Sequence, residues 1–358
     1  MPYYCGVSRG IIQALAAIVA VSAGACGDST LYPWKPDKVP CPPTAMLGFA
    51  AVGGDGADGG VGEATTGGAL GMVVPVSDVG ALTTELQRPA AEPRIIMLTG
   101  MLPLTTPIKV TLDRDVRGGN KTLIGVGADS GLTGAGLDLS YSDNLIIQNI
   151  KIARAAAEEG DAITLLSSHH VWIDHCDLSS DRADTTSGYD GLVDVTHGSS
   201  FITISWTVLH DHKDTSLVGH TADPAQQPED SALRVTYHHN LFSKIGSGPR
   251  VRWGIAHVAN NLFRDVTTFG VVSSSEAYVF VEKNMFGKDV TAPILTTYQD
   301  DVPGTMIEMG NIFPPNAPID IMRPAITPDP LPYSYTPDRP DSVSTLVSSC
   351  AGTGKLEN

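Results

Sequence analysis

The segments RVTYHHNLF (residues 234–242), IAHVANNLF (255–263), YVFVEKNMF (278–286) and TMIEMGNIF (305–313) share one pattern. Each begins with a short strand in which apolar and polar residues alternate, and each ends in Asn-x-Phe, where x is Leu, Met or Ile. The asparagines, at 240, 261, 284 and 311, are separated by 21, 23 and 27 residues. One short strand in every 20–35 residues is typical of a solenoid in which each repeat forms one turn.

Upstream segments fit the same frame with other residues at the Asn position: NLIIQNIKI (144–152), HHVWIDHCDL (169–178) and SFITISWTVL (200–209). Because side chains alternate between the two faces of a strand, stacked turns bury one set and expose the other. We therefore predict an all-β, right-handed parallel β-helix with irregular N- and C-terminal extensions, in which the asparagines hydrogen-bond from turn to turn. The alternative is an antiparallel sandwich, but Asn-Gly or Asp-Gly hairpin turns rarely separate these strands.

The N-terminus has the features of an export signal. Arg9 precedes an apolar run that is too short to span a bilayer, and Ala-Gly-Ala-Cys ends it at Cys26. Two outcomes fit this pattern, acylation of Cys26 as in a lipoprotein or simple secretion, so we expect the protein to be secreted or lipid-anchored at the cell surface. We expect a signal peptide over residues 1–26, a flexible tether over 27–47, the β-helix over 48–345 and a tail over 346–358.

The charge composition limits which classes of partner the protein can bind. The chain of 358 residues has 39 acidic and 23 basic residues and a net charge of −16, which argues against nucleic acid as a partner. An acidic polymer is still compatible if a divalent cation bridges the two. We expect a monomer. Three cysteines lie beyond the signal, Cys41, Cys176 and Cys350. Either Cys41 and Cys350 form a disulfide between the two ends of the chain, or all three are free thiols.

Carboxylates recur near the ends of neighbouring strands. Asp174 ends the strand VWID, and Asp190 and Asp194 flank a glycine in YDGLVD. If these three side chains converge from different turns of the helix, they form the hard oxygen site that Ca²⁺ requires. The Asp-Gly pair alone is also ordinary turn chemistry.

The chain resembles the pectate lyase family of parallel β-helix polysaccharide lyases from about residue 48 to residue 313. The matching segments, in the order of the family, are TTGG, KTLIGVGADSGLTGAGL, NLIIQNIKI, GDAITLLSSHHVWIDH, YDGLVDVTHGSSFITISW, HDH…LVGH, RVTYHHNLF and GPRVRWG…HVANNLF. The resemblance implies cleavage of polygalacturonate by β-elimination, with Ca²⁺ bridging protein carboxylates to substrate uronates. It matches Asp174, Asp190 and Asp194 to the calcium ligands and Arg252 to a substrate-binding arginine.

Two positions depart from the family pattern. Ser247 stands where the family has its catalytic arginine, and Asp214 stands where it has a substrate-binding lysine. Lys213 is one place early for that lysine, and a shift of one residue in a strand turns a side chain to the other face. Arg250 is the candidate substitute base, and it shares a face with Arg252 if the strand is regular.

These departures leave two hypotheses. The first is a secreted, calcium-dependent pectate lyase of reduced activity, because loss of general-base help costs roughly 10²–10⁴-fold while enzymes accelerate reactions by about 10⁶-fold or more. The second is a non-catalytic protein that binds acidic polysaccharide through calcium on the same scaffold. A polygalacturonase ranks below both, because its Asn-Thr-Asp and Arg-Ile-Lys motifs do not occur.

Overall fold

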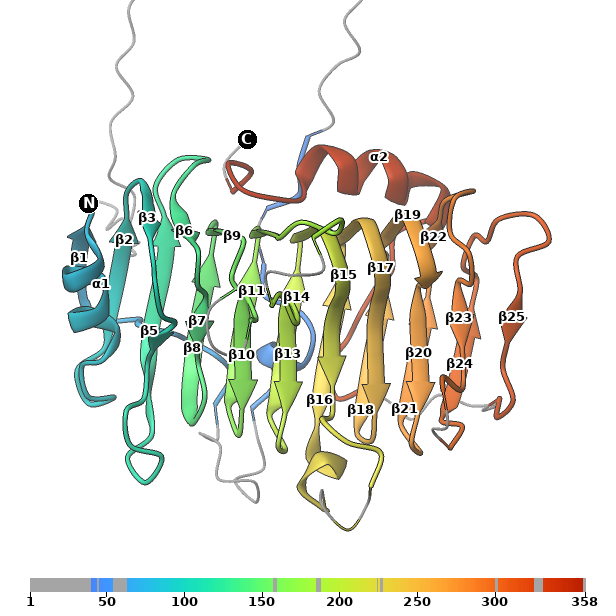
Figure 1. The fold of residues 1–358 in the computed structure, drawn as a ribbon, viewed down its shortest axis with the longest axis horizontal. Helices are drawn as coiled ribbons and strands as arrows, with labels where there is room; N and C mark the ends of the chain where they lie inside the picture. The colour runs from blue at the N-terminus through green and yellow to red at the C-terminus, as the bar shows by residue number, and fades with distance from the viewer. Residues whose placement is uncertain are drawn as a thin grey trace, which may run out of the picture. The chain divides into compact units, whose positions relative to one another are not determined.

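The computed structural model describes residues 40–43, 45–53, 63–156, 160–184, 188–223, 225, 228–299, 302–324 and 331–356. The predicted signal peptide, with Cys26, and most of the predicted tether lie outside these residues. Within them, the chain winds into stacked turns whose strands pair in parallel (Figure 1). The prediction of an all-β parallel β-helix is confirmed.

Two sheets run along the axis of the helix. The ten-stranded sheet contains β1 (Met72–Val76), β2 (Arg94–Leu98), β5 (Gly118–Gly125), β8 (Ser142–Gln148), β11 (His169–Asp174), β14 (Ser200–Ser205), β16 (Arg234–His238), β18 (Ile255–Ala259), β21 (Tyr278–Glu282) and β24 (Thr305–Met309). The path of the fifteen-stranded sheet contains β25 (Ile319–Asp320), β23 (Ile294–Leu295), β20 (Val271–Ser274), β17 (Leu241–Arg252), β15 (Val208–Val218), β12 (Asp177–Ser179), β9 (Lys151–Ala153), β6 (Gly131–Thr133) and β3 (Met101–Pro103). Attached to it are β4 (Ile108–Lys109), β7 (Leu137–Asp138), β10 (Ile163–Leu166), β13 (Val193–Thr196), β19 (Leu262–Phe269) and β22 (Met285–Phe286).

The two long strands β15 and β17 determine where the site forms. In the preceding turn the same path is divided, since β12 ends at Ser179 and β13 begins only at Val193. The first part of β15 pairs with β12 and its end pairs with β13. The loop that carries Asp190 therefore opens beside a continuous strand, and polar residues of both meet there.

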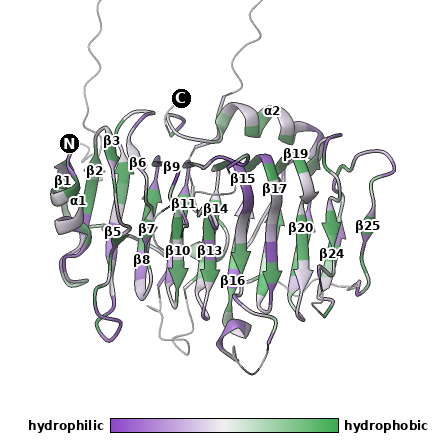
Figure 2. Ribbon diagram, viewed as in Figure 1, coloured by the Kyte–Doolittle hydropathy of each residue, from purple (hydrophilic) through white to green (hydrophobic). Residues whose placement is uncertain are grey.

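The core is a column of aliphatic side chains inside the turns. Alternation is clear in β13, where the two valines are buried and the residues after each of them are partly exposed. Figure 2 shows hydrophobic residues along the strands with hydrophilic ones in the connecting turns. Register keeps like residues stacked: Ile147, Ile173 and Ile204 lie at one position of three successive turns. Burial of each such side chain contributes roughly 1.5–3 kcal/mol, which makes this column the main source of stability.

The Asn-x-Phe repeat forms two ladders, as expected for the asparagines. The Oδ1 atom of Asn261 accepts bonds from the backbone and side-chain amides of Asn240, both at 2.9 Å. Asn284 accepts the equivalent bonds from Asn261, and Asn311 accepts them from Asn284. Phenylalanine rings stack alongside, with centroid separations of 4.7, 4.6 and 5.3 Å.

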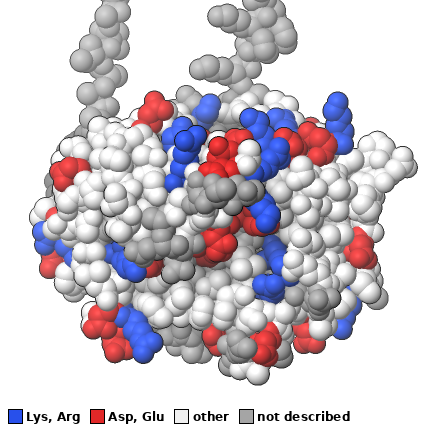
Figure 3. Space-filling model, viewed as in Figure 1, with Lys and Arg blue, Asp and Glu red and all other residues white. Residues whose placement is uncertain are grey.

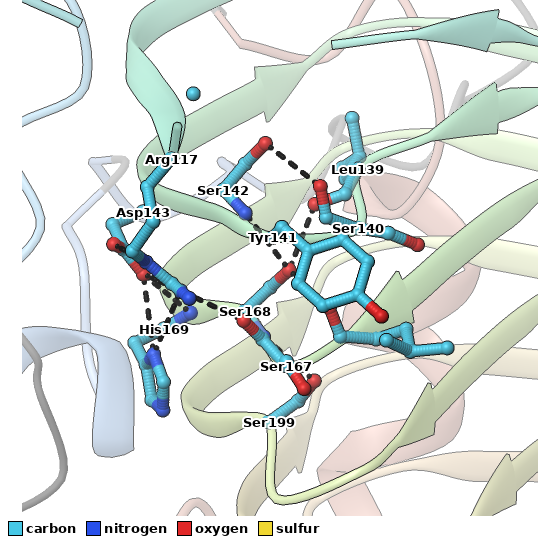
Figure 4. A network of polar contacts seen from close by, with 12 residues as sticks. Arg117, Leu139, Ser140, Tyr141, Ser142, Asp143, Ser167, Ser168, His169 and Ser199 are labelled. Carbon is cyan, nitrogen blue, oxygen red and sulfur yellow. Dashed lines mark hydrogen bonds and ion pairs between the residues drawn. The ribbon is translucent and has the colours of Figure 1, made fainter. Parts of the chain in front are cut away.

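A second polar ladder serves the N-terminal turns, where the Asn motif is absent (Figure 4). The Ser168 hydroxyl accepts from the amide of Ser142, and Ser199 accepts from the amide of Ser168. Beside it the Arg117 guanidinium forms a bidentate ion pair with Asp143, which also contacts His169. The ion pair lowers the pKa of Asp143 despite its burial.

Two α-helices, one toward each end of the described chain, pack against the β-helix. The helix α1 (Val79–Leu86) starts at an Asp78 cap and buries Leu82 and Leu86. Helix α2 (Pro340–Cys350) packs on the outside of the C-terminal turns, so the expected domain boundary at residue 345 falls inside it. Short 3₁₀ segments lie at η1 (Phe49–Ala51) and η2 (Pro228–Ala232). Neither helix of the described chain is long and apolar enough to cross a membrane.

Of the two arrangements considered for the cysteines, the structure has the disulfide. Cys41 and Cys350 are bonded across a separation of 309 residues, and Cys176 is a buried free thiol. The bond fixes the start of the described chain to the end of α2.

Candidate active site

Three carboxylates meet where two turns of the helix adjoin. Asp161 precedes β10, Asp190 ends the loop before β13 and Asp194 lies on β13. Each offers an oxygen, and these oxygens all lie within 4.8 Å of one another. The site therefore supplies only hard oxygen donors, which suit Ca²⁺ better than softer metals.

The pairing of β10 with β13 creates this cluster. Ile163 pairs with Val193, so Asp161 comes beside Gly191 and accepts a bond from its amide at 2.8 Å. A Cβ atom at Gly191 would lie 2.5 Å from Oδ1 of Asp194 and 3.0 Å from Oδ1 of Asp161. Glycine is needed here because any side chain would fill the space between the two carboxylates.

The cluster is short of positive charge. Burial raises the pKa of Asp194 well above its usual value, and the charges of Asp161, Asp190 and Asp214 raise it further. Against this, the amide of Leu217 donates one bond to Asp194 at 3.0 Å, and Thr164 donates one to Asp161 at 2.9 Å. Like charges held this close favour a bound cation, so the residues present fit a calcium ion.

His212 holds the loop that carries Asp190. Its Nε2–H donates to the carbonyl of Asp190 at 2.9 Å, and its Nδ1 contacts the hydroxyl of Ser180. Burial lowers the pKa of His212, which favours the neutral ring that this pair of contacts needs. The sequence analysis assigned His212 no role.

Basic residues line the other side of the same cleft. A cavity of about 290 Å³ is lined by Asp190 and Asp194 together with Lys213, Arg250 and Arg252, the residues predicted for substrate and catalysis. Lys213 stays on the cavity side of β15, although a regular alternation would have turned it away. Figure 3 shows acidic and basic side chains gathered in the middle of this face.

The two departures from the family pattern contact each other. Asp214 and Ser247 are register partners on β15 and β17, and the Ser247 hydroxyl donates to Oδ1 of Asp214 at 2.6 Å. Arg250 lies with its guanidinium carbon 4.9 Å from the centre of the Tyr298 ring. Its Nη atoms are within 3.5 Å of the Gln299 side-chain oxygen and the Tyr298 carbonyl.

The structure does not bring Asp174 to this cluster. Asp174 ends β11 in the ten-stranded sheet, is fully buried and is hydrogen-bonded by Ser205 at 2.6 Å and Gln148 at 2.9 Å. The prediction put VWID and YDGLVD on the same face, whereas one turn of the helix contributes a strand to each sheet. Asp161 takes the third place. It could have been found by aligning GDAI with YDGLV as consecutive turns.

The cleft continues past the acidic cluster toward the N-terminal turns. A second cavity, of about 560 Å³, shares Asp190 and Asp194 with the first and is also lined by Asp161, Lys109 and Arg114. His197 and His220 stack at its edge with ring centroids 3.8 Å apart. Cationic groups therefore lie on both sides of the carboxylates.

Comparisons with known proteins agree with this geometry. The pectate lyase family profile matches residues 40–356. Pectate lyase B of Colletotrichum gloeosporioides is 36% identical over 276 residues, covering 73% of this chain and 79% of that protein. Pectate lyase A of Aspergillus niger is 38% identical over 243 residues, or 68% and 69% of the two chains. A crystal structure of a pectate lyase from Bacillus sp. N165 in complex with trigalacturonate superposes with a TM-score of 0.76 at 29% identity, covering 87% of this chain and 100% of the other.

These similarities and the acidic cleft define a polysaccharide lyase built on a parallel β-helix. The chain belongs to the pectate lyase family, and its function is that of a pectate lyase.

Proposed function

We propose that the protein is a calcium-dependent pectate lyase that is exported from the cell and cleaves polygalacturonate by β-elimination. The observation that carries the proposal is the convergence of Asp161, Asp190 and Asp194 within 4.8 Å, beside arginines in one cavity. The donor set and the raised pKa of Asp194 support a resident Ca²⁺ at this cluster. When bound, Ca²⁺ would neutralise a substrate uronate and make the proton on its C5 carbon more acidic.

The protein's own residues bind the substrate and stabilise the charge that develops in the reaction. Lys213 and Arg252 bind uronate carboxylates of the polymer, and Arg250 and Arg252 stabilise the negative charge that develops on the reacting sugar. His212 keeps the Asp190 loop in place. Because the two cavities share Asp190 and Asp194, a polymer can extend to both sides of the cluster.

Release of unsaturated uronate from polygalacturonate, followed by ultraviolet absorbance, tests the proposal. We expect product with calcium, none with a chelator and none from Asp190→Ala. The non-catalytic alternative, which the comparisons do not favour, instead gives calcium-dependent retention of the polymer without unsaturated product.

Export and assembly have their own tests. The mass of the mature N-terminus distinguishes an acylated Cys26 from a cleaved, unmodified secreted chain. Light scattering of the purified protein tests our proposal that it is a monomer.

A further inference from the structure

The contact between Asp214 and Ser247 holds one carboxylate in a defined position inside the cavity. Ser247 is 3% exposed and donates to Oδ1 of Asp214 at 2.6 Å, whereas the Asp214 side chain is 60% exposed. The Lys213 ammonium lies 3.7 Å from the other oxygen, Oδ2. A buried hydroxyl on one strand thus orients an accessible carboxylate on the next, and Lys213 lies beside that carboxylate.

Arg250, the substitute base expected from the sequence, is engaged by its neighbours. Its guanidinium carbon lies 4.9 Å from the centre of the Tyr298 ring, and the Tyr298 carbonyl and the Gln299 side-chain oxygen accept from its Nη atoms. These contacts hold Arg250 as a positive charge that can bind a uronate carboxylate.

The carboxylates of the cavity fall into two groups, those of the cation cluster and Asp214. Among the described residues that line it, the carboxylates are Asp190, Asp194 and Asp214. The first two belong to the cation cluster, where a bound ion would occupy their lone pairs. Asp214 lies outside the cluster but lines the same cavity as Asp190 and Asp194, so it borders the space a cluster-bound uronate would enter.

We propose that Asp214 is the general base of the elimination and that Ser247 is its positioning residue. The proposal rests on the lyase function proposed above. Asp214 takes the proton from C5, and the electron pair of the C5–H bond forms the C4–C5 double bond. The C4–O bond breaks, and its pair leaves with the glycosidic oxygen, which takes a proton from water. Asp214 then returns its proton to solvent, so that no oxidant or reductant is consumed.

The test compares Asp214→Asn and Ser247→Ala with the wild-type protein at saturating calcium. Asp214→Asn keeps the shape of the side chain but not its basicity, and we expect kcat to fall about 10²–10⁴-fold. The calcium-induced rise in Tm and the retention of polygalacturonate should stay unchanged, since neither depends on the base. For Ser247→Ala we expect a fall of about tenfold in kcat with little change in KM.

The pH profile separates a positioning role from a purely structural one. Ser247→Ala removes a bond to the ionised carboxylate, so the acid limb of kcat should move to higher pH. Asp190, Asp194, Lys213, Arg250 and Arg252 share the cavity with Asp214, so the two pH profiles are compared at the same saturating calcium concentration. Asp214→Glu should restore part of the rate lost in Asp214→Asn.

Three results would overturn the assignment. They are a kcat for Asp214→Asn within about threefold of wild type, loss of the calcium-induced Tm shift in that variant, or an unmoved acid limb in Ser247→Ala. Failure of the proposed function looks different, because the wild-type protein itself would then release no unsaturated product with calcium present.

Discussion

The asparagine ladder and the acidic cluster are two regions where polar side chains stack between neighbouring turns. In the ladder, Asn240, Asn261 and Asn284 are fully buried, and each amide has a donor and an acceptor with partners for both. In the cluster, Asp161, Asp190 and Asp194 present only acceptors to one another. The same β-helix geometry produces a column of mutually hydrogen-bonded amides in one place and a group of like charges in the other.

The difference lies in what each region needs from outside the chain. A buried amide that both donates and accepts completes its hydrogen bonds within the fold, which rigidifies it. Carboxylates that share a site raise one another's pKa and favour a cation. Polar stacking in this fold therefore indicates function where the stacked side chains carry like charges.

The largest expected effect comes from placing a carboxylate inside the ladder. In Asn261→Asp, Oδ1 still accepts from Asn240, but the second oxygen faces the carbonyl of Tyr237, to which the amide had donated at 2.9 Å. We expect a loss of about 3–5 kcal/mol in the free energy of unfolding, the cost of an uncompensated buried charge, measured by denaturant titration. Asn316→Asp is the matched control, since Asn316 is exposed, and it should change stability by less than about 0.5 kcal/mol. Equal stability of the two variants would contradict the role given to the ladder.

The fold was predictable because its determinants are local and repeated. The alternation in segments such as YVFVEKNMF and the recurrence of Asn-x-Phe specify one strand per turn. The asparagine hydrogen bonds follow from that stacking. The sequence pattern does not tell which of the two sheets each strand joins. HHVWID and GDAITLL alternate in similar ways, and their order around the turn depends on the loops between them.

The site was predictable only where its residues lie on one local motif. Asp190 and Asp194 lie on one local motif and meet as expected, and Arg250, Arg252 and Lys213 line the same cavity. Asp174 was misplaced because its position depends on which sheet β11 joins. Asp161 and His212 were missed because their roles depend on contacts across turns, with Gly191 and with the Asp190 carbonyl.

A smaller effect should distinguish Asp161 from Asp174. We expect Asp161→Asn to lower activity by at least about 100-fold, near 2.7 kcal/mol in the barrier, and to abolish the rise in Tm on adding calcium. Asp174→Asn should lower stability, since an amide cannot accept from Ser205, Gln148 and His175 together, yet it should keep the calcium-induced rise. If Asp174→Asn loses that rise while Asp161→Asn retains it, the ligand assignment is wrong.

The smallest expected effect is a gain in stability when one charge leaves the cluster. The folded protein raises the pKa of Asp194 above the unfolded value of about 3.9, so the folded state binds more protons than the unfolded state between these two values. The contribution of Asp194 to stability therefore falls as pH rises through this window, and the penalty is complete above the folded pKa. Asp194→Asn removes the penalty and keeps an acceptor for the Leu217 amide, so at neutral pH with chelator we expect it to be more stable than wild type by on the order of 1 kcal/mol. The difference between the two proteins should vanish in acid, and calcium should reverse its sign by binding the wild-type cluster alone. A variant that is less stable than wild type in chelator at neutral pH would show that the cluster, like the ladder, is satisfied within the fold.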